Sequence, residues 1–126
     1  MVSEINSELF EQKVLNDPKP SIIKIYTEAC PNCKTIHPIF EQTAESNINH
    51  YNFFEMNAHE NLELVKRFKV LSVPTLLFFS HGILVNKKTG VISQKKIEKR
   101  LLPLTNYSKE SAKSKEVTGF FKLPWK

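Results

Sequence analysis

Cysteine is scarce in this chain, which has only two cysteines in 126 residues, and long apolar runs are missing altogether. Two cysteines are too few for a small secreted scaffold that several disulfides hold together, and they fit a reducing cytosol. No run approaches the ~18 apolar residues of a membrane-spanning helix. Residues 1–6 lack the basic and then apolar pattern of a secretion signal. We therefore expect a cytoplasmic protein without a membrane span.

Acidic residues are scarce towards the C-terminus. Residues 1–93 carry nine Lys or Arg against ten Asp or Glu, whereas residues 94–126 carry nine against three. Nucleic-acid binding would be the specific interpretation of this excess, but no glycine-rich loop or recognisable nucleic-acid-binding module accompanies it. A solvated basic face with non-specific attraction to acidic partners is the simpler interpretation. We expect no nucleic-acid partner.

What the chain does contain is enough for one folded domain. Its residues are 40% hydrophobic and include nine phenylalanines, which supply a core of moderate size at this length. We expect a monomer with an α/β fold. The hydrophobic patterns predict the order β-α-β-α-β-α-β-β-α. The predicted strands are 2–5, 22–26, 51–56, 75–79 and 83–86, and the predicted helices are 6–16, 33–45, 57–69 and 93–102.

The last part of the chain differs in composition from the rest. Residues 104–117 are rich in Ser, Lys and Glu, which predicts a mobile linker. Residues 120–125 then gather three aromatic side chains, which either dock on the domain or bind a partner. We predict a domain over residues 1–104 and a basic C-terminal extension with an aromatic end over residues 105–126.

Both cysteines lie in the segment Cys30-Pro31-Asn32-Cys33, between a predicted strand and a predicted helix. Two thiols three positions apart at a helix start are within disulfide reach, and the free N–H groups there stabilise a thiolate. A structural zinc site would need two further ligands, and the four histidines show no suitable spacing. Two inert buried cysteines are the other alternative. The strand–turn–helix context favours thiol–disulfide exchange, with Cys30 as the attacking thiol.

Four separate features of the chain resemble the thioredoxin family over about residues 2–102. The predicted order of elements fits, and the motifs fall in the family's sequence order. They are the active-site segment 26–34, the helix proline Pro38, the cis-proline loop Val73-Pro74-Thr75, and Gly90 before the last helix. The resemblance implies a thioredoxin fold, in which a central mixed β-sheet is flanked by helices on both faces.

The resemblance also implies roles for individual residues. Cys30 would be the nucleophile and Cys33 the resolving thiol. Pro74 would be a cis-proline packed against the disulfide, and Val73 would offer its backbone to a substrate chain as an added strand. The remaining residues implied at the substrate site are Tyr26, for which core packing is an equal alternative, Pro31 and Asn32.

Several positions depart from the family pattern. Pro-Asn stands between the cysteines instead of Gly-Pro, and Ala29 replaces the usual tryptophan. Asn32 could donate a hydrogen bond towards the Cys30 thiolate. Lys24 occupies the place of the family's buried aspartate, and Glu55 occupies that of its partner lysine.

This exchange predicts a charge-swapped ion pair under the cysteines, in which Glu55 accepts the proton of Cys33 directly or through water. The alternative is that both side chains extend to the surface. His37 follows Cys33 by one helical turn, where we expect an ordinary surface histidine.

The first functional hypothesis is a thiol–disulfide oxidoreductase that reduces protein disulfides. It needs no cofactor and no metal, because the two thiols carry the electrons, but it needs an unidentified reductase or thiol electron donor. A second hypothesis is a binding module or adaptor that uses the basic, aromatic C-terminal tail. A third is a disulfide donor or isomerase, because the family resemblance does not fix the direction of exchange.

Overall fold

A computed structural model describes residues 2–117 of the chain. Its centre is a mixed five-stranded sheet in the order β1-β3-β2-β4-β5. Strands β1, β3 and β2 run parallel, whereas β4 is antiparallel to both β2 and β5. The strands are β1 (Val2–Glu4), β2 (Ser21–Tyr26), β3 (Asn52–Asn57), β4 (Thr75–Ser80) and β5 (Ile83–Thr89). The predicted mixed sheet is confirmed.

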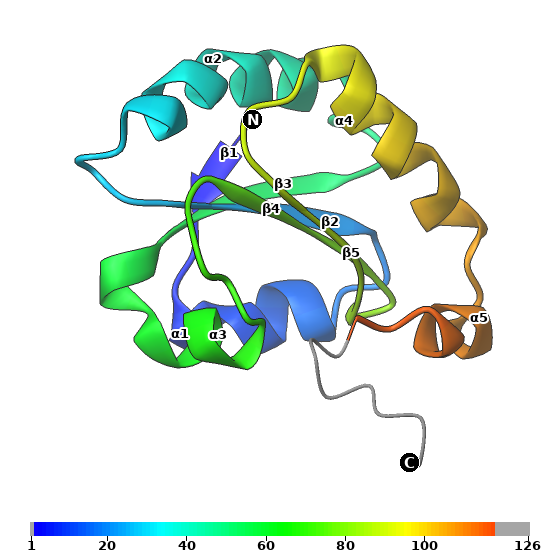
Figure 1. Cartoon of the computed structure of the whole chain (residues 1–126). Coiled ribbons are helices and arrows are strands. Elements are labelled where there is room, and N and C mark those ends of the chain that lie inside the picture. Colours follow the sequence, from blue (N-terminus) through cyan, green and yellow to red (C-terminus); the bar gives the residue numbers. More distant parts are fainter. Residues whose placement is uncertain (1, 118–126) are drawn as a thin grey trace.

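Helices cover both faces of the sheet (Figure 1). Helices α2 and α4 lie on one face, and α1 and α3 lie on the other. The α-helices are α1 (Ser7–Phe10), α2 (Pro31–Ser46), α3 (Leu62–Arg67), α4 (Gln94–Leu101) and α5 (Lys109–Ser114). A π-helical turn, Glu11–Leu15, continues α1, and 3-10 turns occupy Ala58–Glu60 and Leu102–Asn106. Within residues 2–117 no helix is long and apolar enough to cross a membrane.

Two apolar clusters fill the space between the sheet and its helices. The first joins the sheet to α1 and α3 through residues such as Phe10, Ile23 and Leu64. The second joins it to α2 and α4 through residues such as Phe40 and Ile97. The central strand β2 contributes to both clusters, because successive side chains of a strand point to opposite faces. This burial on both sides fixes the strand that leads into the cysteine segment.

The C-terminal region departs from its predicted form. Residues 104–117, predicted to be a linker, form a 3-10 turn and helix α5 instead. Leu104 and Ala112 are buried in the core, and the Val117 N–H donates a 2.7 Å hydrogen bond to the Leu84 carbonyl. The linker prediction is therefore wrong. The predicted aromatic end, residues 120–125, lies outside the described residues.

Candidate active site

The two cysteines lie where β2 gives way to α2. Cys30 is the N-cap of α2, with an extended backbone, and Pro31 is the first residue of the helix. Proline suits this position because the missing N–H would have no partner inside the helix. The Cys33 N–H donates a 3.1 Å hydrogen bond to the Cys30 Sγ. Both thiols are free, and the arrangement directs the positive end of the helix dipole at Cys30.

Cys33 is the more buried of the two cysteines, with 5% of its surface exposed against 9% for Cys30. This burial, with a further contribution from its hydrogen bond with Cys30, raises the pKa of the Cys33 thiol to about 11. The positive charge of Lys24 acts in the opposite direction but is a smaller influence. Only about one Cys33 thiol in ten thousand is ionised at pH 7 at such a pKa. Cys33 therefore needs an acceptor for its proton before it can attack a disulfide.

The loop before β4 faces the cysteines. The Val73–Pro74 peptide bond is cis, as predicted, and the Cys30 Sγ lies 3.7 Å from the Val73 carbonyl oxygen. On the other side of this loop, the Gly90 N–H donates a 2.9 Å hydrogen bond to the Pro74 carbonyl. Gly90 has a φ of 100°, which glycine adopts without a steric cost. The end of β5 is thereby tied to the loop that contacts the reactive sulfur.

Lys24 and Glu55 form the predicted ion pair. They are register partners on the parallel strands β2 and β3, and the Lys24 Nζ lies 3.1 Å from the Glu55 Oε1. The Lys24 side chain is only 3% exposed and that of Glu55 is 22% exposed. The alternative in which both side chains extend to the surface is therefore wrong for Lys24. Its aliphatic stem and ammonium are buried next to the Phe40 ring, whose centroid is 5.4 Å from the Nζ.

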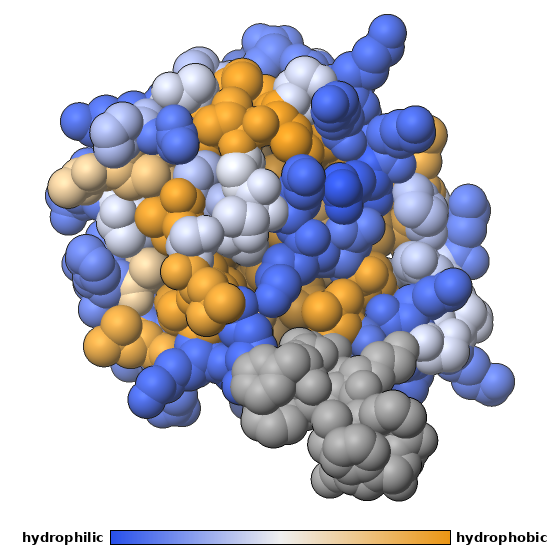
Figure 2. All heavy atoms as spheres, viewed as in Figure 1, coloured by the Kyte–Doolittle hydropathy of each residue, from blue (hydrophilic) through white to orange (hydrophobic). Residues whose placement is uncertain are grey.

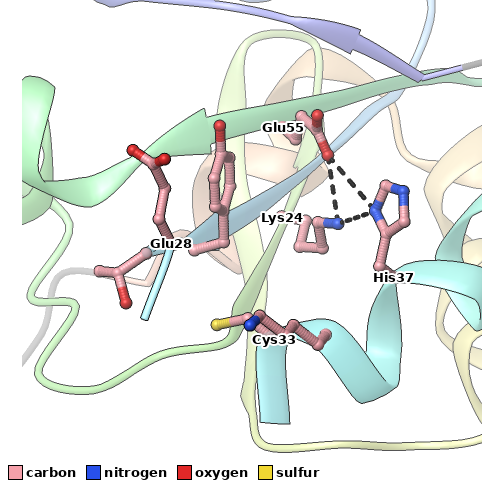
Figure 3. A pocket seen from close by; sticks show the side chains of 8 residues that line it. Lys24, Glu28, Cys33, His37 and Glu55 are labelled. Carbon is pink, nitrogen blue, oxygen red and sulfur yellow. Dashed lines mark hydrogen bonds and ion pairs between the residues drawn. The ribbon is translucent and has the colours of Figure 1, made fainter. Parts of the chain in front are cut away.

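His37 lies at the surface as expected, with 48% of its side chain exposed, but it also contacts this cluster. Its Nδ1 lies 2.7 Å from the Lys24 Nζ and 3.8 Å from the Glu55 Oε1. Figure 3 shows the three side chains converging from β2, β3 and α2. An ammonium group can only donate, so the His37 Nδ1 is the acceptor when the Lys24 ammonium makes this bond. The other ring nitrogen, Nε2, lies 3.6 Å from the Glu41 Oε2.

A pocket of about 190 Å³ connects this cluster to Cys33. Its lining residues are Lys24, Tyr26, Thr27, Glu28, Cys33, Lys34, His37 and Glu55. A cavity of this size has room for water, and the polar side chains in its lining can supply hydrogen-bonding partners. In Figure 3 the Cys33 side chain lies at the start of α2, on the pocket side of the helix. We name this the Cys33 pocket.

The other predicted site residues differ in their exposure and in their contacts. Pro31 and Asn32 are exposed at the start of α2. Tyr26 lines the Cys33 pocket, and its hydroxyl donates a 2.9 Å hydrogen bond to the Glu4 Oε1. In the described part of the chain the Cys33 backbone N–H donates to the Cys30 Sγ, and the hydrogen bond from Asn32 stays a prediction.

A second pocket, of about 240 Å³, lies beside Val73. Thr27 borders both pockets. The side chains around the second pocket are mostly apolar, and Leu71 is 93% exposed and Leu62 62% exposed. Large exposed leucines next to each other are typical of a surface that binds another chain. Sequence reasoning did not identify this surface.

Within residues 2–117 no group of three or more His, Cys, Asp or Glu is placed to hold a metal ion.

Comparison with known proteins agrees with this geometry. The model of a family described as Thioredoxin matches residues 1–102. A thioredoxin of Acidithiobacillus ferridurans is 31% identical over 90 residues, which cover 71% of this chain and 83% of the relative. A thioredoxin of Rickettsia bellii is 28% identical over 91 residues, covering 72% and 87%. Thioredoxin M4 of Arabidopsis thaliana, a chloroplastic protein, is 26% identical over 100 residues, covering 79% and 52%.

Proposed function

Since this chain belongs to the thioredoxin family and is a thiol–disulfide oxidoreductase, we propose that it works in the reducing direction, on disulfides of protein substrates. The observation that carries the proposal is the asymmetry of the two thiols. The Cys30 Sγ accepts a hydrogen bond from the helix start, whereas burial raises the pKa of the Cys33 thiol to about 11. Cys30 is therefore the thiol that attacks the substrate, and Cys33 is the thiol that attacks in the second step.

In the first step the Cys30 thiolate attacks one sulfur of the substrate disulfide. A bond forms between the Cys30 Sγ and that sulfur, the substrate S–S bond breaks, and the departing substrate thiolate takes a proton. In the second step Cys33 loses its proton and attacks the Cys30 Sγ. The Cys30–Cys33 disulfide forms and the mixed disulfide bond breaks. The second substrate sulfur leaves as a thiolate and takes a proton from water, and two electrons have passed to the substrate.

The Cys33 pocket supports the second step. Glu55 takes the Cys33 proton through water in the pocket, which both residues line. Lys24 holds the Glu55 carboxylate by the 3.1 Å ion pair, and its charge favours the Cys33 thiolate. A buried ion pair contributes little to stability because of its desolvation cost. A role in the reaction accounts for its place here.

The substrate contacts that we propose lie on the other side of the cysteines. Val73 presents its backbone to the substrate chain next to the Cys30 Sγ, which is 3.7 Å from the Val73 oxygen. Exposed Leu71 and Leu62 supply apolar contacts beside it. Pro31 and Asn32, exposed next to Cys30, complete this surface.

A separate reductase or thiol donor returns the electrons after each cycle. A related protein of Mycobacterium leprae is named a bifunctional thioredoxin reductase/thioredoxin, and this chain corresponds to 19% of its length. That name supports an enzymatic reductase as the donor. We also propose a cytoplasmic monomer, because a chain with only two cysteines fits a compartment in which thiols stay reduced.

Reduction of insulin disulfides with dithiothreitol as electron donor tests the proposal. Wild-type protein should accelerate the reduction well above the rate with dithiothreitol alone, and Cys30→Ser should abolish the acceleration. If wild-type protein has no effect with this or any other reductant, the proposal is wrong. A reduction potential far more oxidising than that of glutathione would instead indicate a disulfide donor.

A further inference from the structure

A groove of about 490 Å³, separate from the two pockets described above, lies between α4 and the edge strand β5. Four of its seven lining residues are cationic, and none is acidic. The lining residues are Asn86, Lys88, Ile92, Lys96, Lys99, Arg100 and Pro103. Figure 2 shows a hydrophilic surface over this part of the molecule, between α4 and β5. We name it the basic groove.

The four cations of the basic groove have no acidic partners in the described part of the chain. The ion pairs identified among residues 2–117 involve Lys24 or His37 and none of these four cations. Arg100 donates a 2.6 Å hydrogen bond to the Asn86 Oδ1, which is neutral. Glu98, on the same helix, instead accepts hydrogen bonds from Asn47 and Gln94. Like charges that share a low-dielectric concave surface produce a local positive potential.

One end of the basic groove is joined to the loop that contacts the reactive sulfur. Lys88 and Ile92 lie two residues on either side of Gly90 and line the groove, and the Gly90 N–H is bonded to the Pro74 carbonyl. Pro74 follows Val73, whose oxygen is 3.7 Å from the Cys30 Sγ. From Lys96 to Pro103 the groove follows about 10 Å of helical rise, the length of about three residues of an extended chain.

We propose that the basic groove binds an acidic segment of the protein substrate and so selects disulfides whose cysteine is followed or preceded by Asp or Glu. This inference rests on the proposed function and names the substrate class that the site prefers. Exposed Lys96 and Lys99 attract the segment, and the half-buried Lys88 and Arg100 fix it. Single-stranded nucleic acid is the other polyanion to consider, but it is usually bound by aromatic stacking, and no aromatic residue lines the groove.

The experiment uses three synthetic peptides that share one disulfide and differ only in a four-residue flank of Glu, Ser or Lys. Prereduced full-length protein is mixed with each peptide, and the second-order rate constant of reduction is measured in a single turnover, so that no reductase is needed. The Glu peptide should react about tenfold faster than the Ser peptide at low ionic strength, and added salt should shrink this ratio. The Lys peptide should react more slowly than the Ser peptide.

A charge-matched pair of variants locates the effect. Lys96→Glu with Lys99→Glu should abolish the preference for the Glu peptide and leave the rate with the Ser peptide unchanged. Lys13→Glu with Lys113→Glu makes the same change in net charge at exposed positions that do not line the groove, and should keep the preference.

Three results would overturn the inference. Wild-type protein could reduce all three peptides equally, the preference could survive in the groove variant, or it could disappear equally in the control variant. A groove variant that loses only the binding of a single-stranded oligonucleotide, with peptide rates unchanged, would also contradict it. If no peptide is reduced at all, the proposed function itself fails, which is a distinguishable outcome.

Discussion

The Cys33 pocket and the basic groove both contain cationic side chains, but these differ in burial and in pairing. In the pocket, the Lys24 ammonium is buried and is matched by Glu55 at 3.1 Å and His37 at 2.7 Å. In the groove, Lys96 and Lys99 are exposed and have no acidic partner among residues 2–117. A buried charge is expensive unless it is paired, whereas an exposed charge can remain available to a ligand.

This difference separates two tasks. Fixed, mutually bonded charges near Cys33 suit proton transfer within the enzyme, which needs a constant geometry. Unpaired cations at the groove suit encounter with a substrate, because electrostatic attraction acts before contact is made. Changes in the pocket should therefore alter a step of the reaction, and changes in the groove should alter the choice of substrate.

The largest effect should come from removing the thiol at the pocket. Cys33→Ser leaves the Cys30 attack possible but blocks the release step, so the mixed disulfide with substrate accumulates and turnover falls by about a thousandfold or more. Mass spectrometry of the non-reduced protein after mixing with substrate should detect the adduct. Cys30→Ser is the control and should form no adduct. Wild-type turnover by Cys33→Ser would contradict the assignment of the resolving thiol.

The next largest effect should be on stability, from a change in the packing beneath the pocket. Phe40 is fully buried and its ring lies 5.6 Å from that of Phe53. Phe40→Ala should lower the free energy of unfolding by about 3–5 kcal/mol, because it leaves a cavity. Lys96→Ser, at the groove, should change it by less than about 0.5 kcal/mol. Urea denaturation checks both values, and similar losses in the two variants would remove the distinction between the regions.

His37 offers a sharper test inside the pocket. His37→Leu removes the acceptor for the Lys24 ammonium and should slow the release step by a few fold. His37→Asn retains an acceptor near the position of the Nδ1 and cannot change its charge, so it should keep the rate at neutral pH. Single-turnover kinetics measured from about pH 5 to 8, where histidine ordinarily changes its charge, compares the variants. Equal slowing by Leu and Asn would show that His37 does not act as the acceptor.

The smallest effect concerns Glu98, near the groove. Hydrogen bonds from Asn47 and Gln94 hold the pKa of Glu98 below its usual value of 4.5. Its carboxylate therefore stabilises the fold above about pH 4.5, and this contribution is lost as the pH falls through the lowered folded pKa. Glu98→Gln should cost less than about 1 kcal/mol at pH 7, because the group is partly exposed. Chemical denaturation at pH 7 and pH 3 should show a smaller difference at pH 3 than at pH 7.

Much of the site could be predicted because it depends on local sequence. The β-branched run before Cys30 predicts a buried strand, and the apolar spacing after Cys33 predicts a helix, so the position of the two thiols between them could be predicted. The helix begins two residues earlier than predicted, at Pro31. The Lys24–Glu55 pair followed from the resemblance to the thioredoxin family, because the two residues occupy the places of its buried aspartate and partner lysine. The structure shows them as register partners on paired parallel strands.

Other features depend on tertiary contacts that have weak sequence signals. His37 has the helical spacing to face the pocket, but a single histidine does not reveal a lysine partner on another strand. Helix α5 has six residues and buries only Ala112, so its amphipathic pattern is almost invisible. Two serines three positions apart, Ser108 and Ser111, are a weak sequence signal for a helix start, and in the structure they form reciprocal hydrogen bonds there. The basic groove needs the packing of α4 on β5, which composition does not specify.

The central claim is that Glu55 in the Cys33 pocket accepts the proton of Cys33 during release. The most direct measurement is the single-turnover rate of release as a function of pH for wild type, Glu55→Gln and Glu28→Gln. Glu28 lines the same pocket and is exposed, so it is a matched control. Glu55→Gln should slow release at least about tenfold and change its pH dependence, while Glu28→Gln should behave as wild type. A Glu55→Gln protein with the wild-type rate and pH dependence would contradict the account.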